Sequence, residues 1–161
     1  MAGKAGISVR KVRRGSRFEF PGEPQFSIDL LHPSPSEPLP FARSPNDTSL
    51  ALRFSFRGSR ILFLGDVEED GLARLFEEES DLHADVLIAP HHGRANKLWN
   101  VLLEKVRPAA LIVSGSGDGG AREVARNAES AGISVHATWI GGAVRTVWTR
   151  GKGWKPGYWR K

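Results

Sequence analysis

Apolar and polar side chains alternate most clearly over residues 48–56, where every second position from residue 50 onward is Leu or Phe. A period of two places these apolar side chains on one face of a strand. The turn residues 57–59 and the apolar segment 60–64 follow directly, and together they predict a β-hairpin. The members of the apolar face are Leu50, Leu52, Phe54 and Phe56.

Shorter strand-like segments precede this hairpin, and a proline-rich stretch separates them from it. The predicted strands are residues 7–12, 17–20 and 26–31. Proline cannot donate to a sheet ladder, so the stretch with Pro33, Pro35, Pro38, Pro40 and Pro45 predicts a connecting loop.

Beyond residue 64 the pattern changes to helices that alternate with short apolar strands. Helical spacing of apolar residues predicts helices over residues 68–79, 97–106 and 121–131. Continuous apolar segments predict strands at 86–89, 110–113, 134–137 and 143–149. This order predicts a sheet with helices on one face, and something else must cover the other face.

Composition narrows the class of protein. The 161 residues support one domain, and the absence of Cys excludes disulfides, thiolate metal sites and cysteine nucleophiles. No apolar stretch approaches the ~20 residues of a membrane-spanning helix, and no secretory signal is visible, so the chain is expected to be soluble. Its location is otherwise open.

The net charge of the chain is +5, but basic and acidic residues are distributed unevenly over three parts of the sequence. Residues 1–60 hold ten basic and five acidic side chains, residues 61–93 hold one and nine, and residues 94–161 hold twelve and four. The pattern is compatible with solvated faces, or with a cation site between surfaces that attract a polyanion.

Two strand ends carry the candidate chemistry. Asp66 follows a glycine after the strand at 60–64, and His91 and His92 follow the strand at 86–89. Ends of buried strands are where α/β proteins build sites, and imidazole with carboxylate suits zinc-like metals. The alternatives are a helix cap for Asp66 and a hydrogen-bonded turn for the His pair.

Other candidates are weaker. We interpret His32 as structural, His83 as a surface residue and His136 as a residue of the core or of a strand face. The glycine-rich segment 114–120 lies between a strand and a helix, where an anion could bind. It lacks the Gly-Lys-Ser/Thr ending of a P-loop, and a plain loop is the simpler interpretation.

The ordered motifs resemble the metallo-β-lactamase-like domain of the ComEC family, the DNA internalisation proteins of bacterial competence. Asn-Asp-Thr-Ser-Leu-Ala-Leu-Arg at 46–53, Ile-Leu-Phe-Leu-Gly-Asp at 61–66 and Asp-Val-Leu-Ile-Ala-Pro-His-His-Gly at 85–93 carry the resemblance. Shorter matches at 30–33, 106–114 and 135–138 extend it, so that it covers residues 9–147.

The resemblance implies an αββα sandwich with metals, zinc or manganese, at one edge between two sheets. The family's bridging aspartate maps onto Asp66 and its late histidine onto His92, with His91 as a further metal ligand, a group that supports a ligand, or a group on the substrate side. The implied reaction is attack of metal-activated water on a phosphodiester, with Asp66 and His92 as catalytic residues. The parent family lies in the bacterial inner membrane.

Two departures from the family limit that expectation. The motif His-x-His-x-Asp-His is absent, and no histidine stands in the stretch after Ser114 where the family often has Gly-His-Pro. Residues 1–150 therefore resemble the C-terminal half of such a domain. With about three protein ligands needed for a catalytic zinc, the chain alone is expected to bind metal weakly or not at all.

Two hypotheses follow for function. The chain is part of a metal-dependent phosphodiesterase or nuclease of the DNA-uptake type, completed by a partner chain or by a second copy, or it is a non-catalytic module that binds nucleic acid or protein. Residues 151–161 form a basic, aromatic tail without regular structure. Its charges and rings suit binding of single-stranded DNA; alternatively, the rings cover the edge of the domain. The residues proposed to contact DNA are Lys152, Trp154, Lys155, Trp159 and Arg160.

Overall fold

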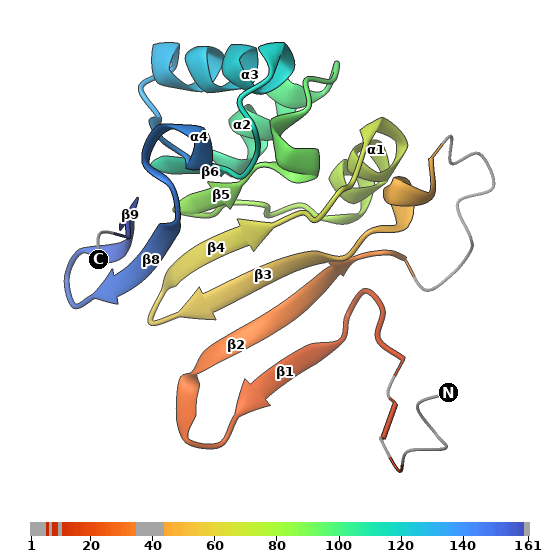
Figure 1. Ribbon diagram of the computed structural model, residues 1–161. Helices are drawn as coiled ribbons and strands as arrows, with labels where there is room; N and C mark the ends of the chain where they lie inside the picture. Colours follow the sequence, from red (N-terminus) through yellow and green to blue (C-terminus); the bar gives the residue numbers. More distant parts are fainter. Residues whose placement is uncertain (1–5, 7, 10, 35–43, 160–161) are drawn as a thin grey trace.

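A seven-stranded mixed sheet forms the centre of the molecule (Figure 1). The structure is a computed structural model that describes residues 6, 8–9, 11–34 and 44–159. The strands lie side by side in chain order. They are β1 (Arg17–Phe20), β2 (Glu23–His32), β3 (Ala51–Phe56), β4 (Ser59–Phe63), β5 (Val86–Ile88), β6 (Ala110–Val113) and β7 (Ser134–Ala137).

Strands β1 to β4 are antiparallel neighbours joined along the chain. The β3–β4 hairpin closes through Arg57 and Gly58, whose φ values of 50° and 81° are both positive. Two successive residues with positive φ give a turn whose twist matches that of the flanking strands. The predicted hairpin is confirmed, with Leu52 opposite Phe63 and Phe54 opposite Ile61.

Strands β4 to β7 run parallel, and helices connect them on one face of the sheet (Figure 1). The helices are α1 (Glu69–Glu78), α2 (Trp99–Val106) and α3 (Gly119–Ser130). Each turns an apolar stripe to the sheet, and Leu72, Leu102 and Val124 pack in one core with the fully buried Leu62, Leu87 and Leu111. The predicted mixed α/β sheet with helices on one face is confirmed.

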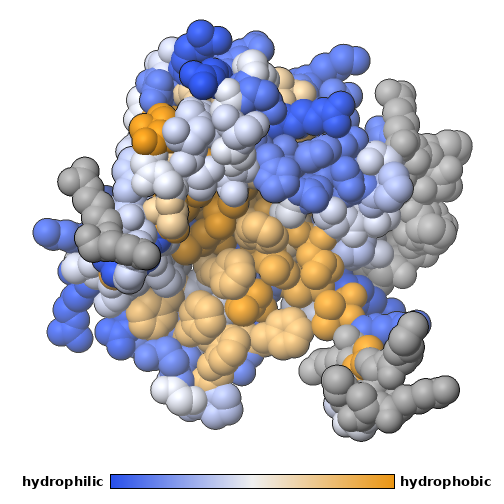
Figure 2. Space-filling view, viewed as in Figure 1, coloured by the Kyte–Doolittle hydropathy of each residue, from blue (hydrophilic) through white to orange (hydrophobic). Residues whose placement is uncertain are grey.

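The opposite face of the sheet is also apolar, and much of it is open to solvent (Figure 2). Pairing across the ladder places the alternate residues of every strand on this side. The face contains the half-buried side chains Phe18, Phe26, Ile28, Leu52, Phe54, Phe56, Ile61, Phe63 and Ile88. We call this set the open apolar face.

A second, two-stranded sheet covers one end of that side. It consists of β8 (Val144–Thr149) and β9 (Gly153–Tyr158), which follow the short helix α4 (Thr138–Gly141). Trp154 packs against the cluster around Val86 and Ile112, and the Trp148 ring lies 4.8 Å from that of Phe56. The hairpin contacts β4 to β7 and leaves β1 to β3 largely uncovered.

Strand β9 corrects the expectation that residues 151–161 contain no regular element. Gly151, with a φ of 74°, lies in the turn, Gly153 begins β9 with a φ of 66°, and Pro156 pairs opposite Thr146. The boundary expected at residue 150 falls within this turn. Trp154 has an apolar surface to pack on, and that tertiary contact stabilises the strand despite its Gly and Pro content.

The N-terminal expectations differ in smaller ways. The described residues among 7–12 form no strand, and the predicted strand 48–56 begins only at Ala51. Leu50 is 41% exposed because it lies in the link from the 3-10 helix η2 (Pro45–Thr48) rather than in the ladder. Pro35, Pro38 and Pro40 lie outside the described residues.

His136 on β7 gives the fold a pH dependence that can be tested. Its imidazole lies 5.9 Å from the Tyr158 ring, and its Nδ1 is buried without a partner among the described residues. Burial disfavours the charged ring and lowers the pKa of His136 below its ordinary value. The unfolded chain therefore binds the proton first, and stability rises with pH.

We expect the contribution of His136 to the free energy of unfolding to be complete above the ordinary histidine pKa of about 6.5. This contribution should fall as the pH drops below that value. His136→Phe keeps an aromatic ring against Tyr158 and should flatten this dependence. Urea unfolding of both proteins at pH 8 and pH 5.5 measures it. Equal losses on acidification would assign the effect to other groups.

Candidate metal centre

The carboxyl ends of the parallel strands β4, β5 and β6 meet at one edge of the sheet, and the candidate residues lie there. Asp66 follows β4, and His92 lies in the 3-10 helix η3 (Pro90–Gly93) after β5. The two side chains approach each other, with His92 Nε2 3.9 Å from Asp66 Oδ1. Strand pairing thus brings together two residues that are 26 positions apart in sequence.

The Asp66 carboxylate does not cap a helix. The N-cap of α1 is Glu68, which makes no side-chain capping bond, and the helix begins at Glu69. Half of the Asp66 side chain is exposed to solvent. The helix-cap interpretation of this residue is therefore wrong, and its carboxylate is open to a ligand.

The His92 ring is held in one orientation by the backbone. Its Nδ1 lies 2.8 Å from the carbonyl oxygen of Ser114, at the end of β6. A carbonyl only accepts, so Nδ1 donates a proton to Ser114, and Nε2 is the ring nitrogen that faces Asp66. Metal-binding histidines have this arrangement, in which one ring nitrogen is fixed by an acceptor and the other binds.

The turn that carries the histidines has an uncommon backbone. His91, His92 and Gly93 have φ values of 45°, 58° and 82°, all in the left-handed region. For non-glycine residues this conformation costs about 1–3 kcal/mol each and persists where the surroundings enforce it. Here the His91 N–H donates to the Gly65 carbonyl at 2.9 Å and the Arg94 N–H to the His91 carbonyl at 3.0 Å.

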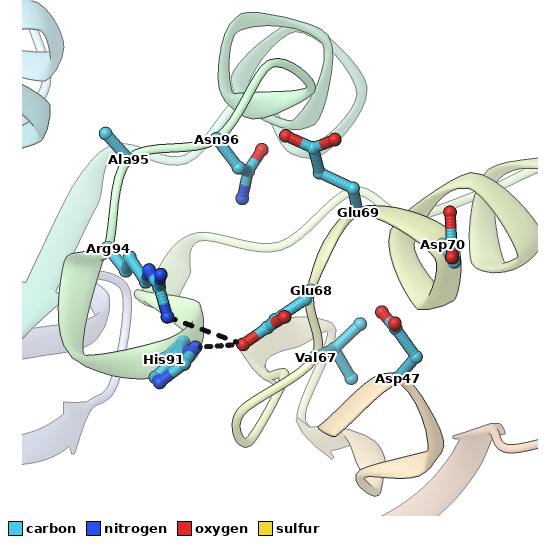
Figure 3. A pocket seen from close by; sticks show the side chains of 9 residues that line it. All are labelled: Asp47, Val67, Glu68, Glu69, Asp70, His91, Arg94, Ala95 and Asn96. Carbon is cyan, nitrogen blue, oxygen red and sulfur yellow. Dashed lines mark ion pairs between the residues drawn. The ribbon is translucent and has the colours of Figure 1, made fainter. Parts of the chain in front are cut away.

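His91 points to a different neighbour from His92. Its Nδ1 lies 2.9 Å from Glu68 Oε1, an ion-pair distance without hydrogen-bond alignment (Figure 3). Asn46 donates to the same oxygen at 3.1 Å. The Asn46 hydrogen bond, followed by attraction from His91, lowers the pKa of Glu68 and keeps it ionised.

A cavity of about 210 Å³ lies beside this pair (Figure 3). Its lining includes the acidic residues Glu68, Glu69 and Asp70, and Arg94 supplies a cation 3.8 Å from Glu68 Oε1. Asp47 also borders it, but this side chain is buried and accepts from the Gly71 N–H at 2.8 Å, which ties η2 to α1.

A larger hollow of about 450 Å³ lies on the other side of the histidine turn, lined by His91, His92, Arg94, Ala95, Asp118 and Gly120. The glycine-rich segment 114–120 forms its far wall. Asp118 caps α3 by accepting from the Ala121 N–H at 3.0 Å, and Gly115 is tied to the Thr138 hydroxyl at 2.9 Å. The hollow opens directly beside His92.

The other histidines do not join Asp66 and His92 in one cluster among the described residues. His32 is buried, with Nε2 2.7 Å from the Asp47 carbonyl oxygen, and His83 Nδ1 lies 3.1 Å from the Val106 carbonyl oxygen. Within the part of the chain that the structure describes, no group of three or more His, Asp or Glu side chains could hold one metal ion. Asp66 and His92 therefore fit part of a metal site and not a complete one.

The β8–β9 hairpin places the residues expected to contact nucleic acid on different sides: one faces the main sheet and others face solvent. Trp154 faces the sheet and packs on Ile112. Lys152 and Lys155 are exposed, and Trp159 is 52% exposed. Arg160 lies outside the described residues.

No family model matches the chain. One known protein sequence does match part of it. The chain is similar to ComE operon protein 3 of Bacillus subtilis (strain 168), with 26% identity over 113 residues. These residues make up 70% of this chain and 14% of that protein, so the chain spans a small part of its relative.

A solved structure supports the fold. A crystal structure from Parabacteroides distasonis ATCC 8503, named "Putative metal-dependent hydrolase", matches with a TM-score of 0.52 and 14% identity, over 86% of this chain and 61% of that one. At this identity the likeness shows the fold, and it is consistent with the metallo-β-lactamase-like arrangement. Among the described residues, no helix is long and apolar enough to cross a membrane.

Three parts of the site were not predicted from the sequence: the Ser114 carbonyl that orients His92, and Glu68 and Asn46 beside His91. A backbone carbonyl leaves no signature in residue type, so Ser114 carried no signal. Asn46 lay within a motif that supported the family resemblance, which was the available signal for a role of its side chain.

Proposed function

We propose that this chain supplies two metal donors, Asp66 and His92, to a metal-dependent phosphodiesterase of the ComEC-like, DNA-uptake type. One observation carries the proposal. The Ser114 carbonyl fixes His92 so that its Nε2 faces the Asp66 carboxylate at 3.9 Å. Two donors on one ion with ligand bonds of ~2.0–2.2 Å lie about 3–4 Å apart.

In this proposal a partner chain supplies the remaining donors. A catalytic zinc site uses about three protein ligands, and the described residues bring two together. The open apolar face supports the proposal that such a polypeptide packs on the sheet, because this face continues from the area under β8–β9 across β1 to β3. A second β layer on this face gives a sandwich with the donors at its edge.

The chain's own residues hold and shape the site. His92 and Asp66 bind the ion, the strained turn and the Ser114 carbonyl keep His92 oriented, and the hollow beside His92 receives the substrate. A divalent metal supplies a water of lowered pKa and neutralises charge on phosphoryl oxygens when bound. The substrate class is a phosphodiester, with DNA as the proposed substrate.

The alternative is a non-catalytic module that keeps this fold for binding alone. It requires no metal at Asp66 and His92, so the dependence of any retained metal on these two residues separates the two functions. After loading with excess Zn²⁺ or Mn²⁺ and dialysis, we expect the chain to retain well under ~0.3 equivalents, because two donors hold an ion weakly.

Stoichiometric, tightly held metal would contradict the half-site, and would mean that a second copy completes it. Hydrolysis of bis(p-nitrophenyl) phosphate by the chain alone would contradict it in the same way. Loss of the residual metal in Asp66→Ala and His92→Ala, but not in the control His83→Ala, supports the assigned donors over the non-catalytic alternative.

A further inference from the structure

The β8–β9 hairpin has two chemically different faces. Pairing places Val144, Trp148 and Trp154 with Pro156 and Tyr158 toward the main sheet, where Trp148 and Trp154 contact Phe56. The alternate positions face away from it. We define the outer hairpin face as Arg145, Val147 and Lys155 on the strands, Arg150 and Lys152 in the turn, and Trp159 just after β9.

The charge of the outer hairpin face is uncompensated. From residue 130 to residue 161 the sequence contains no Asp or Glu. Arg145, Arg150, Lys152 and Lys155 are all exposed. Among the described residues, the ion pairs of the structure lie elsewhere and none involves these four side chains. A one-signed surface of this kind attracts a polyanion.

One aromatic ring on this face is available to a ligand. Trp159 is 52% exposed, whereas the rings of Trp148 and Trp154 are half-buried against the sheet. The Arg145 guanidinium lies 4.7 Å from the centre of the Trp159 ring and orients it as a platform. Exposed aromatic rings among cations stack on unpaired bases while the cations contact phosphates.

We propose that the outer hairpin face binds single-stranded nucleic acid, with Trp159 stacking on a base and Arg145 and Lys155 contacting the backbone. A duplex keeps its bases stacked on one another and gives Trp159 no partner. An acidic protein would use the charges and not the ring. The proposal stands on the surface of the hairpin and does not depend on the metal centre.

The test is binding of fluorescein-labelled oligo(dT) of twenty nucleotides, followed by anisotropy at 20 mM and 150 mM NaCl with EDTA present. EDTA removes divalent metal, so the outcome is independent of Asp66 and His92. We expect weak binding that falls steeply with salt, since each phosphate contact on a single strand contributes a slope of about −0.7. Arg145→Glu/Lys155→Glu should weaken binding at least ~10-fold and make the slope shallower by about one or more.

The matched control is Arg126→Glu, an exposed reversal on α3, which should weaken binding much less. Trp159→Ala keeps every charge and should weaken binding about fivefold or more, because stacking on one base is lost. Thermal unfolding checks that each variant is folded, and Lys152→Glu in the turn serves if the double variant is not.

Three outcomes overturn the proposal. Equal binding by the double variant and the Arg126 control would place the nucleic acid elsewhere. Binding of a twenty-base-pair duplex as tight as oligo(dT), with no effect of Trp159→Ala, would show plain charge attraction to any polyanion, as would complete competition by polyglutamate at equal charge.

Discussion

Replacing Gly93 by alanine should lower the free energy of unfolding by about 2–4 kcal/mol, through a left-handed backbone and a steric overlap. The φ of Gly93 is 82°, and a Cβ there would lie 2.6 Å from Val113 Cγ1. The β6 strand holds Val113 in the buried core, so it cannot yield easily. Urea unfolding followed by circular dichroism measures the loss.

Gly119→Ala is the control for this substitution. Gly119 lies at the start of α3 without a positive φ, and nothing lies within 4 Å of a Cβ placed there. Its unfolding free energy should change by no more than about 0.5 kcal/mol. If Gly93→Ala were as stable as this control, the turn would not be clamped between β4 and β6, and the fixed orientation of His92 would lose its basis.

The open apolar face should make the chain associate in solution. Contiguous apolar patches beyond a few hundred Å² are rare on monomeric proteins, and the uncovered part of this one spans β1 to β3 (Figure 2). Light scattering over a range of concentrations should therefore detect dimers or larger species. Phe54→Glu places a charge in the middle of the face and should weaken association at least ~10-fold.

Val101→Glu provides the matched control, because Val101 is an exposed apolar residue on α2, on the helical side of the sheet. It should leave association unchanged. A wild-type chain that stays a monodisperse monomer would contradict the idea that this face is made to be covered. Equal association of the two variants would place the interface elsewhere.

The sequence predicted the fold where local pattern and burial agree. The alternation around Phe54 gave the β3–β4 hairpin, and the apolar segments 110–113 and 134–137 coincide with β6 and β7. Strand β9 was missed because Gly153 and Pro156 have low strand propensity, and what stabilises them is a surface of the main sheet that forms only in three dimensions.

The candidate site also contains parts that the sequence predicts and parts that it does not. Asp66 and His92 follow strands whose parallel pairing was predictable, so their proximity could be expected from strand order. The bond that orients His92 involves a carbonyl of β6, and the contacts between Glu68, Asn46 and His91 join three separate segments. Such contacts depend on loop conformations that residue type does not encode.

The central claim is that Asp66 and His92 share one metal ion, and paramagnetic broadening tests it most directly. Substoichiometric Mn²⁺ added to the ¹⁵N-labelled chain broadens the amide signals nearest the ion, even when binding is weak. We expect selective loss of signals at residues 65–67, 91–93 and 114–115, and its abolition by both Asp66→Ala and His92→Ala. Broadening centred on the acidic residues 68–70 instead, or unchanged in these variants, would contradict the account.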